Sequence, residues 1–136
     1  MNKNQLKKWL QQDEGLRLKP YLDIVNKTSI GYGRNLSDNG ITEEEANYLL
    51  DNDINRVEKE LLEYQFYIDA PSSVKDALFN MCFNLGLPKL LEFKRMIQCL
   101  KEKNYAKASL EIIDSKYYHQ VGERARYVVA LMKLAK

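Results

Sequence analysis

The stretch from Glu14 to Leu36, EGLRLKPYLDIVNKTSIGYGRNL, decides the fold because helical periodicity gives way to a strand pattern within it. Two carboxylates lie in this stretch, Glu14 at the end of an amphipathic segment and Asp23 nine residues later. Pro20 stands between them and prevents a single helix from carrying both. We therefore expect two environments, one at a helix end and one in a wetter hairpin. That difference lets one carboxyl carry a proton while the other stays ionised, as hydrolysis of a glycosidic bond requires.

A strand interrupted by glycines, Ser29-Ile30-Gly31-Tyr32-Gly33, follows the second carboxylate and is typical of a backbone that approaches a ligand closely. Glu-Gly-Leu-Arg-Leu, then Tyr and Asp, then a hydroxyl residue before Ile-Gly-Tyr-Gly, resembles the phage-type lysozymes, the endolysins of glycoside hydrolase family 24. The spacings of nine and six residues that separate Glu14, Asp23 and Ser29 are similar to those of the family's catalytic triad. The resemblance implies Glu14 as general acid, Asp23 as general base and Ser29 as the hydroxyl that helps to hold the attacking water.

Two positions depart from the family pattern. Most members carry Thr where this chain has Ser29, although Thr28 precedes it, and strand alternation allows only one of the two to face Asp23. Many members carry His where this chain has Arg34, which stays charged at any relevant pH. We expect Arg34 to pair with Asp53 and so tie the sheet to a helix; the alternative is that both charges are solvated.

The remaining pattern predicts an α+β fold that is mostly helical. Thr42 and Glu45 form a capping box that begins a long helix over about 43–63, after a loop over 37–40. Apolar periodicity predicts further helices over about 2–13, 72–85, 88–100, 105–113 and 127–134. We expect a single lysozyme domain with a small hairpin lobe (about 14–42), a linking helix (about 43–63) and a helical lobe (about 70–136) that also receives the amino-terminal helix.

The resemblance also implies residues that contact the substrate or support the site. Asn35, Phe83 and Asn84 are expected to contact sugar, and Arg124 is expected to approach Glu14 from the helical lobe. Two alternatives stay open, because Phe83 could be part of the core and Arg124 could lie on a solvated basic helix face.

Composition narrows the chemistry further. The net charge of +2 is too small to indicate nucleic acid, and no segment has the pattern of a secretory signal or a membrane span. A single histidine makes a Ser-His-Asp triad or a multi-histidine metal site improbable, and the proposed hydrolysis requires no cofactor. Cys82 and Cys99 lie among apolar neighbours and are expected to be buried free thiols.

We therefore predict an endolysin that cleaves the β-1,4 bond between N-acetylmuramic acid and N-acetylglucosamine in bacterial peptidoglycan and causes lysis. The enzyme is expected to be a monomer that stays in the host cytoplasm until its release. Three alternatives remain: a chitinase or chitosanase that uses the same carboxylates, a wall-binding module with weak or no turnover, and a helical interaction protein.

Overall fold

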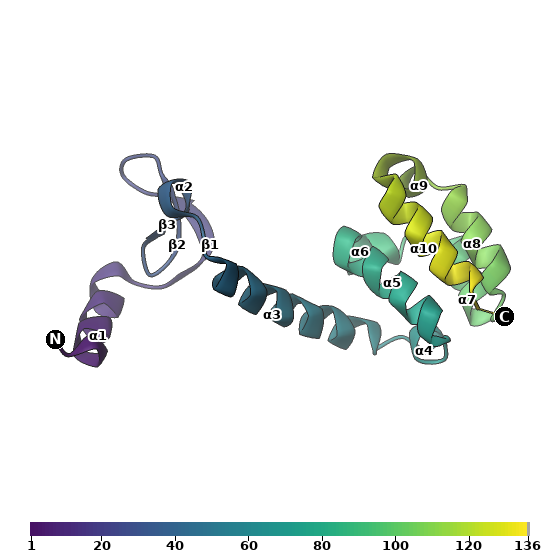
Figure 1. Cartoon of the computed structure of the whole chain (residues 1–136), viewed down its shortest axis with the longest axis horizontal. Coiled ribbons are helices and arrows are strands. Elements are labelled where there is room, and N and C mark those ends of the chain that lie inside the picture. The colour runs from purple at the N-terminus through teal and green to yellow at the C-terminus, as the bar shows by residue number, and fades with distance from the viewer. Residues whose placement is uncertain (136) are drawn as a thin grey trace. The chain divides into compact units, whose positions relative to one another are not determined.

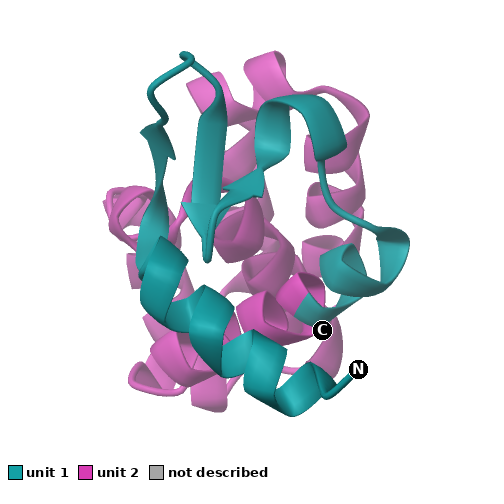
Figure 2. Ribbon diagram, turned by 90° about the vertical axis from the view of Figure 1, so that its left-hand side faces the viewer, with its two compact units in different colours: residues 1–48 teal, residues 49–136 magenta. Residues whose placement is uncertain are grey.

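The computed structural model describes residues 1–135, which form two compact units that divide after Tyr48 (Figures 1 and 2). The first unit contains helix α1, a three-stranded sheet, the short helix α2 and the start of helix α3. The second unit is entirely helical. The predicted α+β class, mostly helical with a small sheet near the amino terminus, is confirmed.

The first unit begins with α1 (Lys3–Glu14), which Asn2 caps by accepting a hydrogen bond from the Gln5 amide at 3.1 Å. The antiparallel sheet follows, in the order β1-β2-β3. The third strand and α2 were not predicted, because the sequence indicated only a hairpin and then a loop. The bounds are β1 (Arg17–Leu22), β2 (Thr28–Gly31), β3 (Arg34–Asn35) and α2 (Leu36–Asn39).

The register of the first hairpin shifts within β1. Arg17 pairs with Gly31, but Tyr21 pairs with Ser29, so the strand is irregular between Arg17 and Tyr21. Pro20 lies in this interval and has no N–H to donate to the ladder, which accounts for an irregularity here. The hairpin then turns through Asn26, whose positive φ of 62° is a conformation that Asn tolerates better than most residues.

Helix α3 (Glu43–Leu61) begins with the predicted capping box. Thr42 Oγ1 accepts a hydrogen bond from the Glu45 amide at 3.1 Å, and Glu45 Oε1 accepts one from the Thr42 amide at 2.9 Å. Three glutamates in the first turn also suit the positive end of the helix dipole. The boundary between the two units falls inside this helix, after Tyr48.

The second unit packs its helices around one apolar core. Helix α5 contributes Val74, Ala77, Leu78, Met81 and Cys82, and α10 packs against both α5 and α8. Every buried hydrophobic residue of the described chain belongs to this unit. Its remaining helices are α4 (Gln65–Ile68), α5 (Ser72–Leu85), α6 (Leu87–Leu90), α7 (Lys94–Lys101), α8 (Tyr105–Ile113), α9 (Lys116–Val121) and α10 (Glu123–Lys133).

Several helix bounds differ from the prediction. The stretch expected as one helix over 88–100 is two, because the backbone leaves the helical region at Phe93, with φ −77° and ψ 63°. The expected junction near Tyr117 is helix α9, and the last helix begins at Glu123 rather than near Tyr127. The predicted helices over 72–85 and 105–113 are confirmed to the residue.

Both cysteines are buried and free, as predicted. Burial raises the pKa of the Cys82 thiol to about 11, with a further increase from the charge of Glu60. No helix within residues 1–135 combines the length and the apolar character that crossing a membrane demands.

Candidate active site

Glu14 is the last residue of α1, and its carboxylate lies against the backbone of Gly33. A Cβ atom added to Gly33 would stand 2.7 Å from Glu14 Oε2 and 3.1 Å from its Cδ. Gly33 also has a positive φ of 77°, which side-chain-bearing residues rarely adopt. A residue with a side chain at this position would therefore force the Glu14 carboxylate to move.

The two leucines near Glu14 in the sequence do not cover its carboxylate within the first unit, since Leu16 is 53% exposed and Leu18 is 79% exposed.

Asp23 is held in the turn of the first hairpin by backbone donors. Its Oδ1 accepts hydrogen bonds from the amides of Val25 and Lys27, both at 2.9 Å. Its own amide donates to the Lys27 carbonyl at 2.9 Å, which extends the ladder by one residue beyond β1. These bonds leave Oδ2 available to a water molecule while they fix the orientation of the carboxylate.

The register favours Ser29 over Thr28 as the hydroxyl that shares a face with Asp23. Ser29 pairs with Tyr21, and residues that are opposite each other in a sheet point to the same side. Asp23 follows Tyr21 by two positions, so strand alternation assigns it to the same face as Ser29. Ser29 is 3% exposed, whereas Thr28 is half-buried and pairs with Leu22.

The expected Arg34–Asp53 ion pair is wrong. The Arg34 guanidinium binds Glu45 instead, with Nη1 donating to Oε1 at 2.8 Å and Nη2 donating to Oε2 at 2.7 Å. The capping box holds Glu45 beside the start of α3, and Arg34 Nη1 also reaches the Gly40 carbonyl there at 3.1 Å. Asp53 belongs to the second unit and pairs there with Arg56 at 3.5 Å.

The ion pair between Arg34 and Glu45 favours the charged form of both side chains. The hydrogen bond from Arg34 lowers the pKa of the Glu45 carboxyl to about 2, and the Thr42 amide contributes a smaller lowering. The hydrogen bond and charge of Glu45 raise the pKa of Arg34. The pair is therefore charged throughout the pH range in which enzymes usually work.

Asn35 uses both polar atoms of its side chain within the first unit. Its Oδ1 caps α2 by accepting from the Asp38 amide at 3.0 Å, and its Nδ2 donates to Asp38 Oδ2 at 2.9 Å. Its predicted role as a sugar contact stays a prediction.

The predicted residues of the second unit lie near the ends of two helices. Phe83 is 38% exposed and Asn84 is exposed at the end of α5, so the alternative that Phe83 is a core residue is wrong. Arg124 on α10 donates through Nε to Asn80 Oδ1 at 2.7 Å, and its expected approach to Glu14 stays a prediction. Asn80 was missed because nothing in its spacing marks it as a partner of a residue 44 positions away.

The structure adds three residues that the sequence reasoning did not include in the site: Lys27, Asp38 and, as an ion-pair partner, Glu45. The capping box identifies Glu45 in the sequence, but its pairing with Arg34 depends on the conformation of the loop between the two residues. Within the described residues, no group of three or more His, Cys, Asp or Glu side chains could hold a metal ion.

A mostly helical chain with a small antiparallel sheet near its amino terminus has the architecture of the lysozyme-like α+β class. The family model described as phage lysozyme matches residues 11–132. The chain therefore belongs to the phage lysozyme family of glycoside hydrolases, which confirms the resemblance and the prediction of an enzyme.

Individual relatives agree with the family. The chain is 25% identical to the probable T4-type lysozyme 2 of Dictyostelium discoideum, over 94% of this chain and 93% of that protein. The probable T4-type lysozyme 1 of the same organism has the same identity and coverage. The SAR-endolysin of bacteriophage PS119 is 32% identical over 54% of this chain and 46% of that protein.

Proposed function

We propose that this protein is an endolysin that hydrolyses the β-1,4 bond between N-acetylmuramic acid and N-acetylglucosamine in bacterial peptidoglycan, and that its action at the cell wall causes lysis. Glu14 protonates the glycosidic oxygen as the bond breaks. Asp23 takes a proton from a water molecule that attacks the anomeric carbon from the opposite face of the sugar. Ser29 helps to hold that water.

The observation that carries this proposal is the way Asp23 is fixed. Two backbone amides bind Oδ1, while the register assigns Ser29 to the same face of the sheet. A general base must be oriented and must keep one oxygen within reach of the water it activates. The hydrogen bonds to Asp23 Oδ1 support this role, and Glu14, which lies against Gly33, is our candidate for the second carboxyl that the reaction needs.

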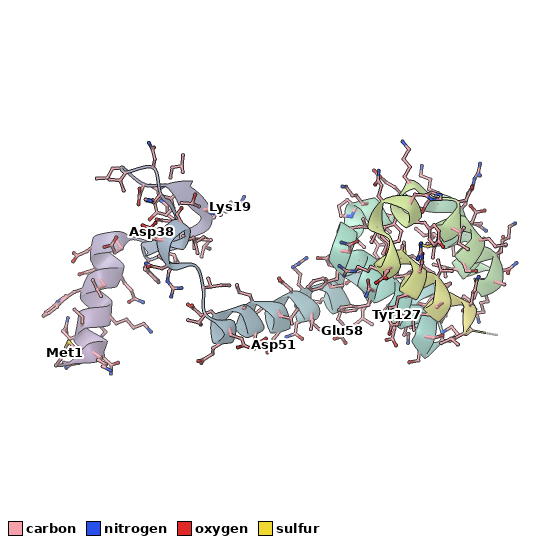
Figure 3. The ribbon with its side chains drawn as sticks, turned by 45° about the horizontal axis from the view of Figure 1, so that its top comes forward. Met1, Lys19, Asp38, Asp51, Glu58 and Tyr127 are labelled. Carbon is pink, nitrogen blue, oxygen red and sulfur yellow. The ribbon has the colours of Figure 1, made fainter. Side chains whose placement is uncertain are left out.

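The experiment measures turbidity of purified peptidoglycan together with the appearance of new reducing ends. Wild-type protein should clear the suspension and release muramic reducing ends. Glu14→Gln and Asp23→Asn should each lower the rate by roughly 10²-fold or more, because each removes a proton-transfer group. Glu58→Gln, which neutralises an exposed carboxylate on α3, is the matched control and should retain the wild-type rate (Figure 3).

Two outcomes separate the alternatives. Retention of the wild-type protein on the wall pellet without new reducing ends would replace the enzyme with a wall-binding module. Hydrolysis of chitin at a rate equal to that of peptidoglycan would replace the muramidase with a chitinase. The configuration of the first product, read by NMR of the anomeric proton, should be inverted if a water molecule attacks directly.

A further inference from the structure

Two separate networks of hydrogen bonds begin at neighbouring residues of β3, Arg34 and Asn35. The Arg34 network holds the residue that follows Gly33, which contacts Glu14, and the Asn35 network leads through Lys27 to Asp23. We propose that residues 34–38, which we call the positioning segment, set the places of both Glu14 and Asp23. This inference rests on the proposed function, and it assigns a role in positioning to residues that touch no reacting atom.

The first network holds the turn that contacts Glu14. The carboxylate of Glu14 lies against Gly33, and Gly33 immediately precedes Arg34 in the chain. The guanidinium of Arg34 is held by both oxygens of Glu45 and by the Gly40 carbonyl. Since a bidentate pair restricts direction as well as distance, the turn that contacts Glu14 is tied to the first turn of α3.

The second network fixes the Asp23 turn. The side-chain Nδ2 of Asn35 donates to Asp38 Oδ2, and Asp38 Oδ1 accepts from Lys27 Nζ at 3.1 Å. The backbone amide of Lys27 donates to Asp23 Oδ1. A hydrogen bond of 2.9 Å from the Thr28 amide to Ser37 Oγ runs beside this path. Figure 3 labels Asp38, whose carboxylate joins the two ends of the network.

Two ion pairs of opposite polarity hold the positioning segment, one at each end. Arg34, at one end of the segment, pairs with Glu45 in the first turn of α3. Asp38, at the other end, pairs with Lys27 beside the hairpin turn. Both pairs are partly exposed, and strong screening by salt should weaken them. A displacement of the carboxylates by about 1 Å is enough to slow catalysis by up to roughly 10²-fold.

The first test uses Arg34→Gln, Glu45→Gln and the double variant. Gln at position 45 can still accept the Thr42 amide, so the capping box survives. We expect kcat on soluble peptidoglycan fragments to fall about tenfold in each single variant, with KM within about twofold, because positioning affects the reaction more than binding. The double variant should be no worse than either single variant, since each single variant already lacks the bidentate ion pair.

Glu60→Gln is the matched control for this pair. It removes the Arg56–Glu60 contact, another exposed ion pair between Arg and Glu, at 3.0 Å within α3. It should leave kcat unchanged. A comparable fall of kcat in Glu60→Gln, or kcat values in the Arg34 and Glu45 variants within twofold of wild type, would overturn the first half of the proposal.

The second half is tested by Asp38→Ala, with Asp51→Ala, an exposed acid on α3, as control (Figure 3). Only Asp38→Ala should shift the NMR amide resonances of Val25 and Lys27, which donate to Asp23. It should also lower kcat with little change in KM. Unchanged resonances together with unchanged kcat would overturn this half.

A readout without turnover separates this inference from the proposed function. A nuclear Overhauser contact between Gly33 Hα and the Glu14 side-chain protons should be present in wild-type protein, because the two groups are in contact. That contact should weaken in the Arg34→Gln/Glu45→Gln variant. If wild-type protein proves inactive, the proposed function fails but this NMR comparison still decides the positioning role; an unaltered contact overturns it.

Discussion

Ser29 is the only buried residue in the described first unit. The second unit buries a continuous set of apolar side chains that extends from Val57 to Met132. The first unit instead contains two ion pairs, a capping box and side-chain caps on α1 and α2. The comparison teaches that one unit is stabilised mainly by apolar burial, and the other is ordered by directional polar contacts. The candidate catalytic carboxylates, Glu14 and Asp23, lie in the first unit, which is ordered by polar contacts.

The largest expected effect is a loss of stability in the apolar core of the second unit. Leu78→Ala removes a fully buried side chain from α5 and should lower the free energy of unfolding by about 2–5 kcal/mol. Leu110→Ala on α8, where the leucine is 60% exposed, should change it by less than about 0.5 kcal/mol. Denaturant unfolding followed by circular dichroism measures both. Equal losses in the two variants would contradict the description of this core.

The next largest effect is on the rate of hydrolysis, and it comes from a change in the first unit that leaves the apolar core of the second unit intact. Gly33→Ala should lower the rate of wall hydrolysis more than tenfold, because its Cβ would displace the Glu14 carboxylate. Gly31→Ala is the control: it has a similar positive φ of 70° but open space around the added Cβ. Both variants should lose about 1 kcal/mol from backbone strain. The idea fails if Gly31→Ala loses as much activity as Gly33→Ala.

A smaller effect sharpens the account of the apolar unit. The hydroxyl of Tyr117 is buried and has no hydrogen-bond partner among residues 1–135, and burial raises its pKa. Tyr117→Phe should therefore leave the stability unchanged or raise it by up to about 1 kcal/mol. Tyr117→Ala also removes the ring that packs edge-on against Phe93 and should cost about 3–5 kcal/mol. A loss above about 1 kcal/mol in Tyr117→Phe would show that the hydroxyl has a partner.

The smallest effect concerns pH. The pKa of Glu45 falls from its usual 4.5 to about 2 in the folded protein, so the ion pair with Arg34 stabilises the fold above pH 4.5. That stabilisation declines as the pH falls through about 2. The difference in stability between wild type and Glu45→Gln should be constant from pH 7 to about 5 and vanish near pH 2. A difference that persists below pH 2 would assign the effect to something other than ionisation.

The sequence predicted the helices whose ends carry a local signal. Gly86 ends the helix over 72–85, and Asn104 caps the helix over 105–113 by accepting from the Lys107 amide at 3.1 Å. The break near Phe93 had no such signal, because neither Gly nor Pro lies between Lys89 and Leu100. Tertiary packing decides that bend, and periodicity alone does not reveal it.

For the candidate site, the sequence indicated which residues carry the chemistry, but it did not indicate which side chains pair with each other. The spacing of Glu14, Asp23 and Ser29 was visible through the family resemblance, but the choice of Glu45 rather than Asp53 by Arg34 was not. That choice depends on how the chain from Leu36 to Gly40 folds into α2 and brings the Gly40 carbonyl beside Arg34. A charge pattern identifies possible partners, while a loop conformation selects among them.

Burial of both cysteine thiols limits their reactivity in the folded helical unit. Cys82 is 2% exposed and Cys99 is 4% exposed, and neither forms a disulfide. With a pKa of about 11, the Cys82 thiol carries very little thiolate at neutral pH, and thiolate is the form that exchanges with disulfides or reacts with oxidants. In the folded helical unit, the Cys82 thiol should therefore react slowly with oxidants and with disulfides.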